Sequence, residues 1–281
     1  MFEEKLDIYF NKEQIKALKS DLNAKTRSNI INENFFAKIG KNDESLFYNN
    51  LKKELALYIE NKSNPFIPKL VDSFQNESFT MIILKRINGK TLSNHRNNYN
   101  SCVREKKRIF IAKEVLNIKN IYLSNSYVDD KYDRSEKFEK YFERSKKFLS
   151  RNTINKIKKL ESDIILENYE RVLSHGDLIG PNIITNKDNV FFIDWEFFSM
   201  KPRYYDLIYF LLFSKTNKST EIIYKLGLTD NEIKEALKDG IIICLKEIQN
   251  NAKLFNKVDE KIVFKNINRW KRELKYILEE F

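Results

Sequence analysis

Residues 182–194 constrain the fold of this chain more than any other stretch, because they read as a β-hairpin with a polar residue at each end. An apolar pair follows Asn182, turn-forming residues occupy 186–189, and a second apolar run fills 190–193. Asp194 comes directly after that second run. Because a hairpin folds its two ends together, the pattern brings Asn182 and Asp194 side by side.

The polar residues of this stretch suit one kind of chemistry. Amide and carboxylate oxygens, here those of Asn182 and Asp194, are hard ligands that can hold Mg²⁺ on the phosphates of a nucleotide. Asp177, five positions before Asn182, can orient a hydroxyl group and accept its proton. An Asp, four residues, an Asn and then an Asp at a strand end form the catalytic layout of eukaryotic-type kinases. An ordinary surface turn flanked by polar residues is the alternative.

The local wording is more particular than this layout. His-Gly-Asp at 175–177, the step to Asn182, and Ile-Asp-Trp-Glu at 193–196 resemble the aminoglycoside phosphotransferase and choline kinase family of small-molecule kinases. The resemblance extends from about residue 28 to residue 213 and is strongest over 172–207. It implies an enzyme that uses Mg²⁺ and moves the γ-phosphoryl group of ATP or GTP to a hydroxyl of a small molecule.

The same resemblance implies the fold and its division. We expect an α+β, bilobal, protein-kinase-like fold, with a small N-terminal lobe built on an antiparallel sheet and a larger, mostly helical C-terminal lobe. The nucleotide-binding lobe would span residues 1–88, with a hinge at about 85–89. Residues 89–281 would carry the catalytic loop and the acceptor site. Gly89 would allow a sharp turn out of the last strand of the first lobe.

The implied roles in phosphoryl transfer fall on five side chains. Asp177 would be the catalytic base, and Asn182 and Asp194 would bind the metal. Lys38, in an apolar run that reads as a strand, would reach the phosphates as a point charge. Glu54, in the middle of a predicted helix, would pair with Lys38, although a solvent-facing strand lysine and a solvated helix face are the plainer alternatives.

The nucleotide loop departs from that of protein kinases. No Gly-x-Gly-x-x-Gly occurs between residues 24 and 35, so we expect Ser28, Asn29 and backbone amides to contact the phosphates there. By resemblance, the carbonyl of Lys85 and the amide of Ile87 would recognise the nucleotide base.

Four residues near the motif are expected to support it. His175 would fix the loop by hydrogen bonds, and Glu196 would assist the metal site or order the loop. Asp206 would buttress the catalytic loop, which is compatible with the simpler role of a helix N-cap. Trp195 is expected to pack in the core.

Apolar periodicity and turn signals predict the remaining elements. The predicted helices span 3–22, 44–61, 103–123, 207–213, 219–226, 230–249 and 256–279, and the chain from 123 to about 168 is also expected to be helical. The predicted strands span 25–31, 35–39, 69–74 and 79–86.

Composition narrows the class of protein. The 281 residues carry a net charge of +11, which we attribute to a diffuse lysine bias rather than to a nucleic-acid site. No run of 18 apolar residues predicts a membrane span, and the charged N-terminus does not resemble a signal peptide. Cys102 and Cys244 lie far apart and lack the spacing of metal ligands, so we expect buried or half-buried thiols in a reducing cytoplasm.

The acceptor is less constrained than the donor. Between residues 131 and 160 there are eleven Lys or Arg and four acidic residues, which indicate a solvated helical face or a basic rim near the acceptor. Lys201 and Arg203 weaken the case for a polycationic aminoglycoside. Three acceptor classes nevertheless stay open: an amino alcohol such as choline, an aminoglycoside-like antibiotic, and a sugar or cell-envelope precursor. Aromatic residues at helical spacing usually belong to the core, but they are also the candidates for binding a cationic acceptor: Phe197, Phe198, Tyr204, Tyr205, Tyr209 and Trp270.

Two other classes of function compete with an active kinase. A kinase-fold pseudoenzyme or scaffold would bind nucleotide without transfer, and the intact set of Asp177, Asn182 and Asp194 argues against it. A basic nucleic-acid-binding protein has only the net charge in its favour.

Overall fold

The computed structural model of the chain describes residues 2–25, 27–41, 46–93, 105–121, 123–124, 132–166, 169–187, 189–214 and 219–281. The described chain forms two compact units. Unit 1 comprises Met1–Thr91, Asn120–Val128 and Asn182–Phe198, and unit 2 comprises Leu92–Lys119, Asp129–Pro181 and Ser199–Phe281. The predicted hairpin therefore belongs to the same unit as the N-terminal sheet. The division expected from the sequence, into residues 1–88 and 89–281, placed the hairpin in the second part.

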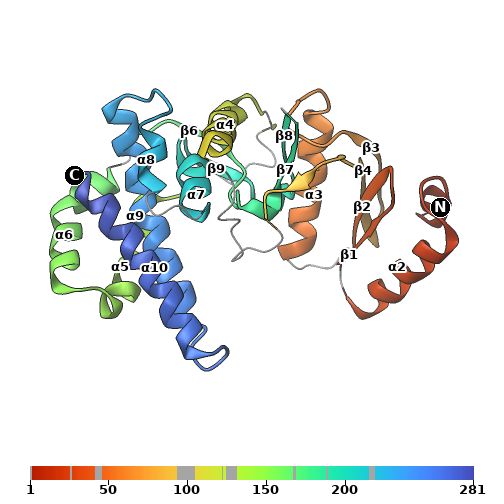
Figure 1. The fold of residues 1–281 in the computed structure, drawn as a ribbon. Helices are drawn as coiled ribbons and strands as arrows, with labels where there is room; N and C mark the ends of the chain where they lie inside the picture. The colour runs from red at the N-terminus through yellow and green to blue at the C-terminus, as the bar shows by residue number, and fades with distance from the viewer. Residues whose placement is uncertain are drawn as a thin grey trace. The chain divides into compact units, whose positions relative to one another are not determined.

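Unit 1 is built on a four-stranded antiparallel sheet with the strand order β1-β2-β4-β3 (Figure 1). Its strands are β1 (Arg27–Ile31), β2 (Phe35–Lys41), β3 (Leu70–Gln75) and β4 (Phe79–Lys85). A second sheet has the order β5-β7-β8, with β5 (Lys90–Thr91), β7 (Ile183–Asn186) and β8 (Asn189–Phe192). The continuous apolar run of β4 explains its central place, because both of its faces are covered.

Helices α1 (Phe2–Asp7) and α2 (Lys12–Ala24) cover one face of the four-stranded sheet. The prediction of one helix over 3–22 was wrong. The first helix ends at Asp7, and Asn11 caps the second, because its side chain accepts a hydrogen bond from the Gln14 amide while the Gln14 side chain accepts one from the Asn11 amide. The Asn-x-x-Gln spacing of this capping box was readable in the sequence.

The two faces of β2 have different tasks. Ala37 and Ile39 belong to the apolar core under α1 and α2, whereas Lys38, pointing the other way, meets α3 (Leu46–Glu60). Figure 1 shows α2 and α3 on opposite sides of the sheet. The alternation along one strand thus separates a structural face from a polar one.

Gly89 lies at a bend between β4 and β5, at the place where the sequence predicted a turn out of the strand. Its φ lies outside the left-handed region, so close neighbouring atoms, rather than backbone strain, require glycine there. A Cβ atom there would lie 2.7 Å from a methyl carbon of Ile184 and 2.8 Å from the carbonyl oxygen of Thr185. Glycine lets the chain of β5 approach β7 closely.

Unit 2 is mostly helical. Its helices include α4 (Glu105–Leu116), α5 (Arg134–Ser145), α6 (Arg151–Ile165), α7 (Tyr205–Phe213), α8 (Ser219–Ile223), α9 (Asp230–Ala252) and α10 (Glu260–Glu279), and β6 (Arg171–Ser174) pairs with β9 (Ser199–Pro202). Single turns of 3₁₀ helix also occur at η1 (Asn117–Asn120), η3 (Lys146–Phe148), η4 (Gly180–Asn182) and η5 (Trp195–Phe197). All of η5 belongs to unit 1, as do the last residues of η1 and η4. The helical character expected up to about residue 168 is present as two separate helices, α5 and α6, because Ser150 caps the second helix.

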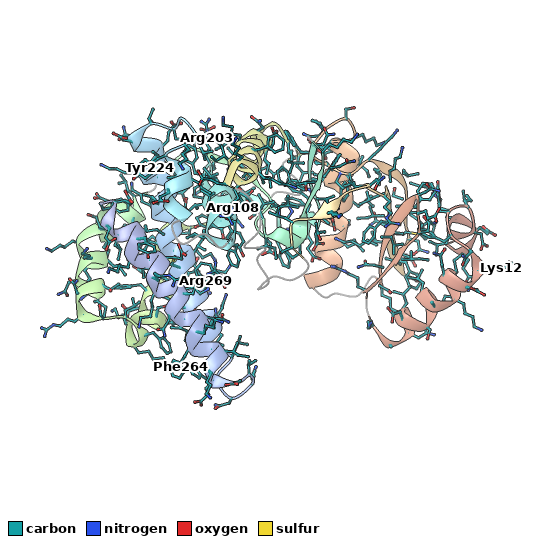
Figure 2. All side chains as sticks on the ribbon, viewed as in Figure 1. Lys12, Arg108, Arg203, Tyr224, Phe264 and Arg269 are labelled. Atoms are coloured by element: carbon teal, nitrogen blue, oxygen red, sulfur yellow. The ribbon has the colours of Figure 1, made fainter. Side chains whose placement is uncertain are left out.

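Helix α9 is the central helix of unit 2 and packs against α5, α7 and α10. Gly240 allows this close packing, since a Cβ atom there would lie 3.0 Å from side-chain carbons of Ile208 and Ile277. Arg269 of α10, labelled in Figure 2, donates to the carbonyl of Leu212 at 2.5 Å and so ties α10 to α7. The predicted solvated face over 131–160 has one clear exception in the fully buried Arg134, which pairs with Asp239.

No helix within the described residues combines the length and the apolar character needed to cross a bilayer. Cys244 is buried and unpaired. The other cysteine, Cys102, lies outside the described residues.

Candidate active site

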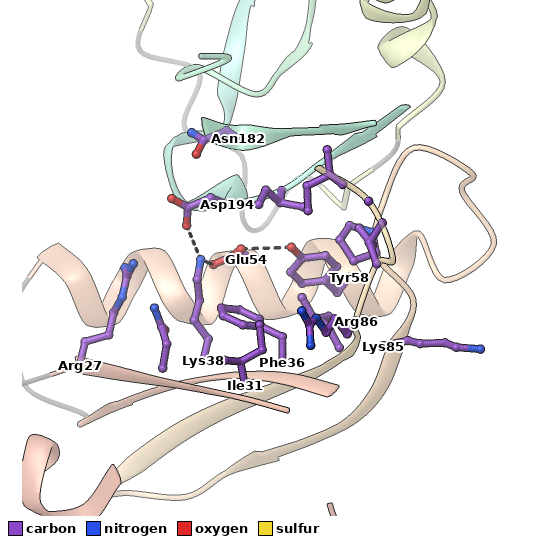
Figure 3. Close-up of a pocket in the computed structure, with 17 residues that line it drawn as sticks. Arg27, Ile31, Phe36, Lys38, Glu54, Tyr58, Lys85, Arg86, Asn182 and Asp194 are labelled. Atoms are coloured by element: carbon purple, nitrogen blue, oxygen red, sulfur yellow. Dashed lines mark hydrogen bonds and ion pairs between the residues drawn. The ribbon is translucent and has the colours of Figure 1, made fainter. Parts of the chain in front are cut away.

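Unit 1 contains a cavity of about 380 Å³ with an apolar end and a charged end (Figure 3). Its walls come from β1, β2, α3, the chain after β4 and the β7–β8 hairpin. The lining residues are Arg27, Asn29, Ile31, Phe36, Lys38, Glu54, Tyr58, Pro68, Leu84, Lys85, Arg86, Ile87, Gly89, Asn182, Ile184, Ile193 and Asp194. Six of the residues predicted from the sequence to bind nucleotide or metal therefore lie around one cavity, together with Glu54.

Lys38 lies at the centre of the charged end. Its ammonium group donates to Glu54 Oε2 at 2.7 Å and also pairs with Asp194 Oδ1 (Figure 3). Burial lowers the pKa of Lys38, but the two carboxylates outweigh burial and raise it above its ordinary value. Lys38 is consequently a fixed positive charge, held by a carboxylate on the helix and a carboxylate on the hairpin.

Glu54 is held by more than this ion pair. Its side chain is 1% exposed, and Oε1 accepts hydrogen bonds from the Tyr58 hydroxyl at 3.2 Å and the Trp195 amide at 3.1 Å. Trp195 is fully buried, and its indole N–H donates to the Phe192 carbonyl. Its expected packing role is confirmed. Tyr58, one helical turn after Glu54, was missed, although the spacing places both side chains on one face of α3.

The hairpin joins Asn182 and Asp194 as its pattern predicted. Ile183 pairs with Phe192, and the Ile193 amide donates to the Asn182 carbonyl at 2.9 Å. Asp194 has φ 68° and ψ 57°, a left-handed conformation that is uncommon for a residue other than glycine. This conformation directs the chain from β8 into η5 directly at the cavity.

The phosphate-loop prediction is half corrected by strand alternation. Asn29 lines the cavity, but the Ser28 hydroxyl donates to Asp21 of α2 at 2.8 Å, away from it. Neighbouring residues of a strand point to opposite faces, so both side chains could not share the cavity. The same alternation puts Arg27 beside Asn29 on the cavity side, which sequence reasoning missed.

Lys85 and Ile87 line the other end of the cavity, as the resemblance implied. Glu196 lies in η5 and forms an ion pair with Arg27. Burial raises the pKa of Glu196, as does the neighbouring Asp194 carboxylate, while Lys38 and Arg27 oppose the rise.

The catalytic-loop residues lie in unit 2. Asp206, which is 5% exposed, accepts the His175 amide at 2.6 Å and the Gly176 amide at 3.0 Å. Gly176 has φ 84°, a left-handed conformation that glycine adopts without strain. The His175 Nδ1 atom accepts the Asp177 amide at 3.4 Å. These contacts are those that the expected supporting roles of His175 and Asp206 require.

Two further residues hold this loop. The Tyr209 hydroxyl of α7 donates to Asp177 Oδ1 at 3.0 Å. Lys201 of β9 donates to the Gly176 carbonyl at 3.3 Å, and burial lowers the pKa of Lys201 to about 8. The sequence left Tyr209 open as a ligand-binding aromatic group or a core residue, and indicated Lys201 only as a cation that disfavours an aminoglycoside acceptor, since burial cannot be read from residue type alone.

The donor set of unit 1 fits a magnesium ion that arrives with a nucleotide. Among the described residues, no group of three or more His, Cys, Asp or Glu side chains could hold a metal. Magnesium is usually held by one or two protein oxygens together with waters and phosphates, and Asn182 and Asp194 supply such oxygens. Lys38 adds positive charge on the same side of the cavity.

Comparison with known sequences agrees with this chemistry. Residues 63–227, more than half of the chain, match the model of the phosphotransferase enzyme family APH. A protein LicA homolog from Mycoplasma capricolum subsp. capricolum is 27% identical over 90 residues, which cover 32% of this chain. That alignment spans only 38% of the relative's own length.

Solved structures share the fold over nearly the whole chain. A choline/ethanolamine kinase family protein from Mesorhizobium loti is 12% identical, with a TM-score of 0.62 and coverage of 91% of this chain and 90% of that one. An ethanolamine kinase from Plasmodium vivax is 18% identical, with a TM-score of 0.53 and coverage of 96% and 83%. An amicoumacin kinase in complex with AMP-PNP and Ca²⁺ is 9% identical, with a TM-score of 0.54 and coverage of 97% and 95%.

The predicted α+β, protein-kinase-like fold is therefore confirmed by these structures and by the sheet and helices of the two units. The family model covers the catalytic loop and the hairpin, so the chain belongs to the phosphotransferase enzyme family.

Proposed function

We propose that this chain transfers the γ-phosphoryl group of ATP or GTP to a hydroxyl group of a small molecule. The observation that carries the proposal is the arrangement of Lys38, Asn182 and Asp194 around one cavity. A buried cation beside two oxygen ligands is what the phosphates of a nucleotide and their metal require. The membership of the family of phosphotransferases supports the same reaction.

Phosphoryl transfer depends mainly on positioning and on neutralising charge. Lys38 would bind the phosphates and remain fixed there by Glu54. A bound Mg²⁺, held by Asn182 and Asp194, would neutralise the charge that develops on the transferring group. Lys85 and Ile87 would take the nucleotide base at the apolar end of the cavity, and Asn29 would contribute from β1.

Asp177 would orient the acceptor hydroxyl and accept its proton. The Tyr209 hydroxyl donates to Oδ1 of Asp177, and this hydrogen bond helps to orient the carboxylate. Asp206 fixes the backbone on the N-terminal side of Asp177 through two amides, so the carboxylate is carried by a rigid loop. General-base catalysis of this kind contributes about 10²- to 10⁴-fold to a rate.

The acceptor that we propose to test first is an amino alcohol, because two of the similar structures are kinases of the choline and ethanolamine type. The cations that argued against an aminoglycoside carry less weight than expected. Lys201 is buried and Arg203 pairs with Glu170 at 2.6 Å. Tyr205 and Trp270 are buried in unit 2, which disfavours them as walls of a cage for a cationic acceptor.

The test measures nucleotide binding and transfer separately. ATP consumption with choline, ethanolamine, aminoglycosides and sugars is compared between the wild type and Asp177→Ala. We expect Asp177→Ala to keep Mg²⁺-dependent ATP binding and to lose transfer by about 10²-fold or more. Asp194→Ala should lose the Mg²⁺ dependence of binding.

The outcomes separate the competing functions. A wild-type protein that binds no nucleotide would exclude a kinase. Tight ATP binding without transfer to any acceptor, unchanged in Asp177→Ala, would favour a pseudoenzyme or scaffold.

A further inference from the structure

Arg27 shares the cavity with Lys38, but the roles proposed above leave this cation without a task. Its guanidinium group forms an ion pair with Glu196. The Arg27 side chain is 26% exposed, whereas Glu196 is 8% exposed. The cation is thus partly open to the cavity and its partner is buried behind it.

The strand register explains how Arg27 reaches the cavity. Arg27 lies across from Gly40 of β2, and Asn29 lies across from Lys38. Because Gly40 has no side chain, the surface of the sheet beside Arg27 stays clear for its long side chain. Figure 3 shows Arg27 and Lys38 rising from the strands toward the same side.

The register also gives the place of Arg27 along the cavity. Phe35 pairs with Lys85 at the end proposed for the nucleotide base, and Lys38 pairs with Ile82 further along the sheet. Gly40 and its partner Arg27 lie two residues beyond Lys38, a distance of about 7 Å along the strand. If Lys38 binds the inner phosphates, Arg27 is at the terminal phosphate.

We propose that Arg27 binds the terminal phosphate of the nucleotide, and that Glu196 competes with this phosphate for the guanidinium group. This inference rests on the proposed nucleotide-binding function. Arginine suits the task, since its planar fork binds two phosphate oxygens at once. It also supplies phosphate contacts where the chain lacks a glycine-rich loop, and where the Ser28 hydroxyl faces Asp21 instead.

In this proposal, the Arg27–Glu196 ion pair stays intact until the nucleotide arrives. Glu196 holds the guanidinium group in place and spares it from searching many rotamers. A phosphate then exchanges one anionic partner for another. Because the nucleotide must displace Glu196 from Arg27, the ion pair reduces the affinity for the nucleotide. Removal of the Glu196 carboxylate should therefore increase this affinity.

The experiment measures the dissociation constants of ATP, AMP and adenosine by calorimetry, with EDTA present so that no metal contributes. Arg27→Met, which keeps the apolar stem, should weaken ATP binding by about 10- to 100-fold. AMP and adenosine should bind within about twofold of the wild type, because neither has a phosphate at that position. Arg27→Lys should recover part of the ATP affinity.

Lys25→Ala is the matched control, since Lys25 is an exposed cation two residues before Arg27 and pairs with Asp21. It should change none of the three dissociation constants. Glu196→Gln should strengthen ATP binding several-fold, and the double variant with Arg27→Met should bind no better than Arg27→Met alone.

Three results would overturn the inference. Arg27→Met could bind ATP as the wild type does, which would exclude a phosphate contact. Arg27→Met could also lose affinity for adenosine as strongly as for ATP, which would show a structural role. Glu196→Gln could strengthen ATP binding equally with and without Arg27, which would exclude competition. A wild type that binds no ATP even when Mg²⁺ replaces EDTA would instead refute the proposed function, and the role of Arg27 with it.

Discussion

Replacing Glu54 by Gln tests whether the buried cation of the cavity depends on the helix that faces it. The amide keeps one oxygen and replaces the other by an NH₂ group. With the oxygen toward Tyr58 and Trp195, the NH₂ group faces the ammonium of Lys38, which already donates. Of the two carboxylates that pair with Lys38 in the wild type, only that of Asp194 then remains.

The expected cost follows from burial. Lys38 and Glu54 have side chains that are 6% and 1% exposed, and removing one partner of a buried ion pair costs about 3–5 kcal/mol. Because Asp194 remains, we expect the lower end, about 3 kcal/mol. Lys38→Met should cost less, about 2 kcal/mol, since Glu54 keeps its hydrogen bonds from Tyr58 and Trp195.

The assay is guanidinium unfolding of both single variants and the double variant, without nucleotide. The double variant should cost at least about 1 kcal/mol less than the sum, because it removes both buried charges. Glu279→Gln is the matched control, as Glu279 lies in an exposed pair with Lys275 at 3.7 Å, and it should stay within about 0.5 kcal/mol of the wild type. A Glu54→Gln protein as stable as this control would refute the reasoning.

Two further substitutions test unit 2. Asp206→Asn removes the charged acceptor of the His175 and Gly176 amides and turns an NH₂ group toward one of them. It should destabilise the protein by about 2–3 kcal/mol and lower kcat while KM for ATP stays unchanged. A KM for ATP that changes as much as kcat would contradict a role confined to the catalytic loop. Lys201 faces Asp206, Lys246, Asp177 and Asp239, and its pKa falls from 10.5 to about 8 on folding because burial disfavours its charge. The unfolded chain therefore binds more protons between pH 8 and pH 10.5, and the stability contributed by Lys201 rises over that range by about 3 kcal/mol. The free energies of unfolding of the wild type and Lys201→Met are measured from pH 7 to pH 10.5, and that of the wild type should rise by this amount relative to the variant. A difference between the two proteins that does not change with pH would contradict the burial of a titrating lysine.

The charged end of the cavity was predictable wherever local spacing determines it. The turn at 186–189 dictates that Asn182 and Asp194 meet, since hairpin pairing is a local property of the chain. The pairing of Lys38 with Glu54 followed from a resemblance, and the structure has it at 2.7 Å. Roles in binding and catalysis stay predictions that the variants above address.

Other features could not be predicted because they depend on contacts between distant segments. Arg27 and Glu196 are 169 residues apart, and no local pattern pairs them. The burial of Lys201 depends on how β9 packs in unit 2, whereas its residue type favours the surface. Ser28 is different, because the alternation of a strand already excluded its sharing a face with Asn29.

The two carboxylates that hold Lys38 differ in a way that bears on how the cavity works. Glu54 is 1% exposed and is fixed by Tyr58 and Trp195, whereas Asp194 is 31% exposed. In the proposed function, the buried carboxylate would keep Lys38 in place while the exposed one exchanges its partner for a metal. Positive charge would then already be in position when the phosphates arrive, and little reorganisation would remain to be done during the reaction.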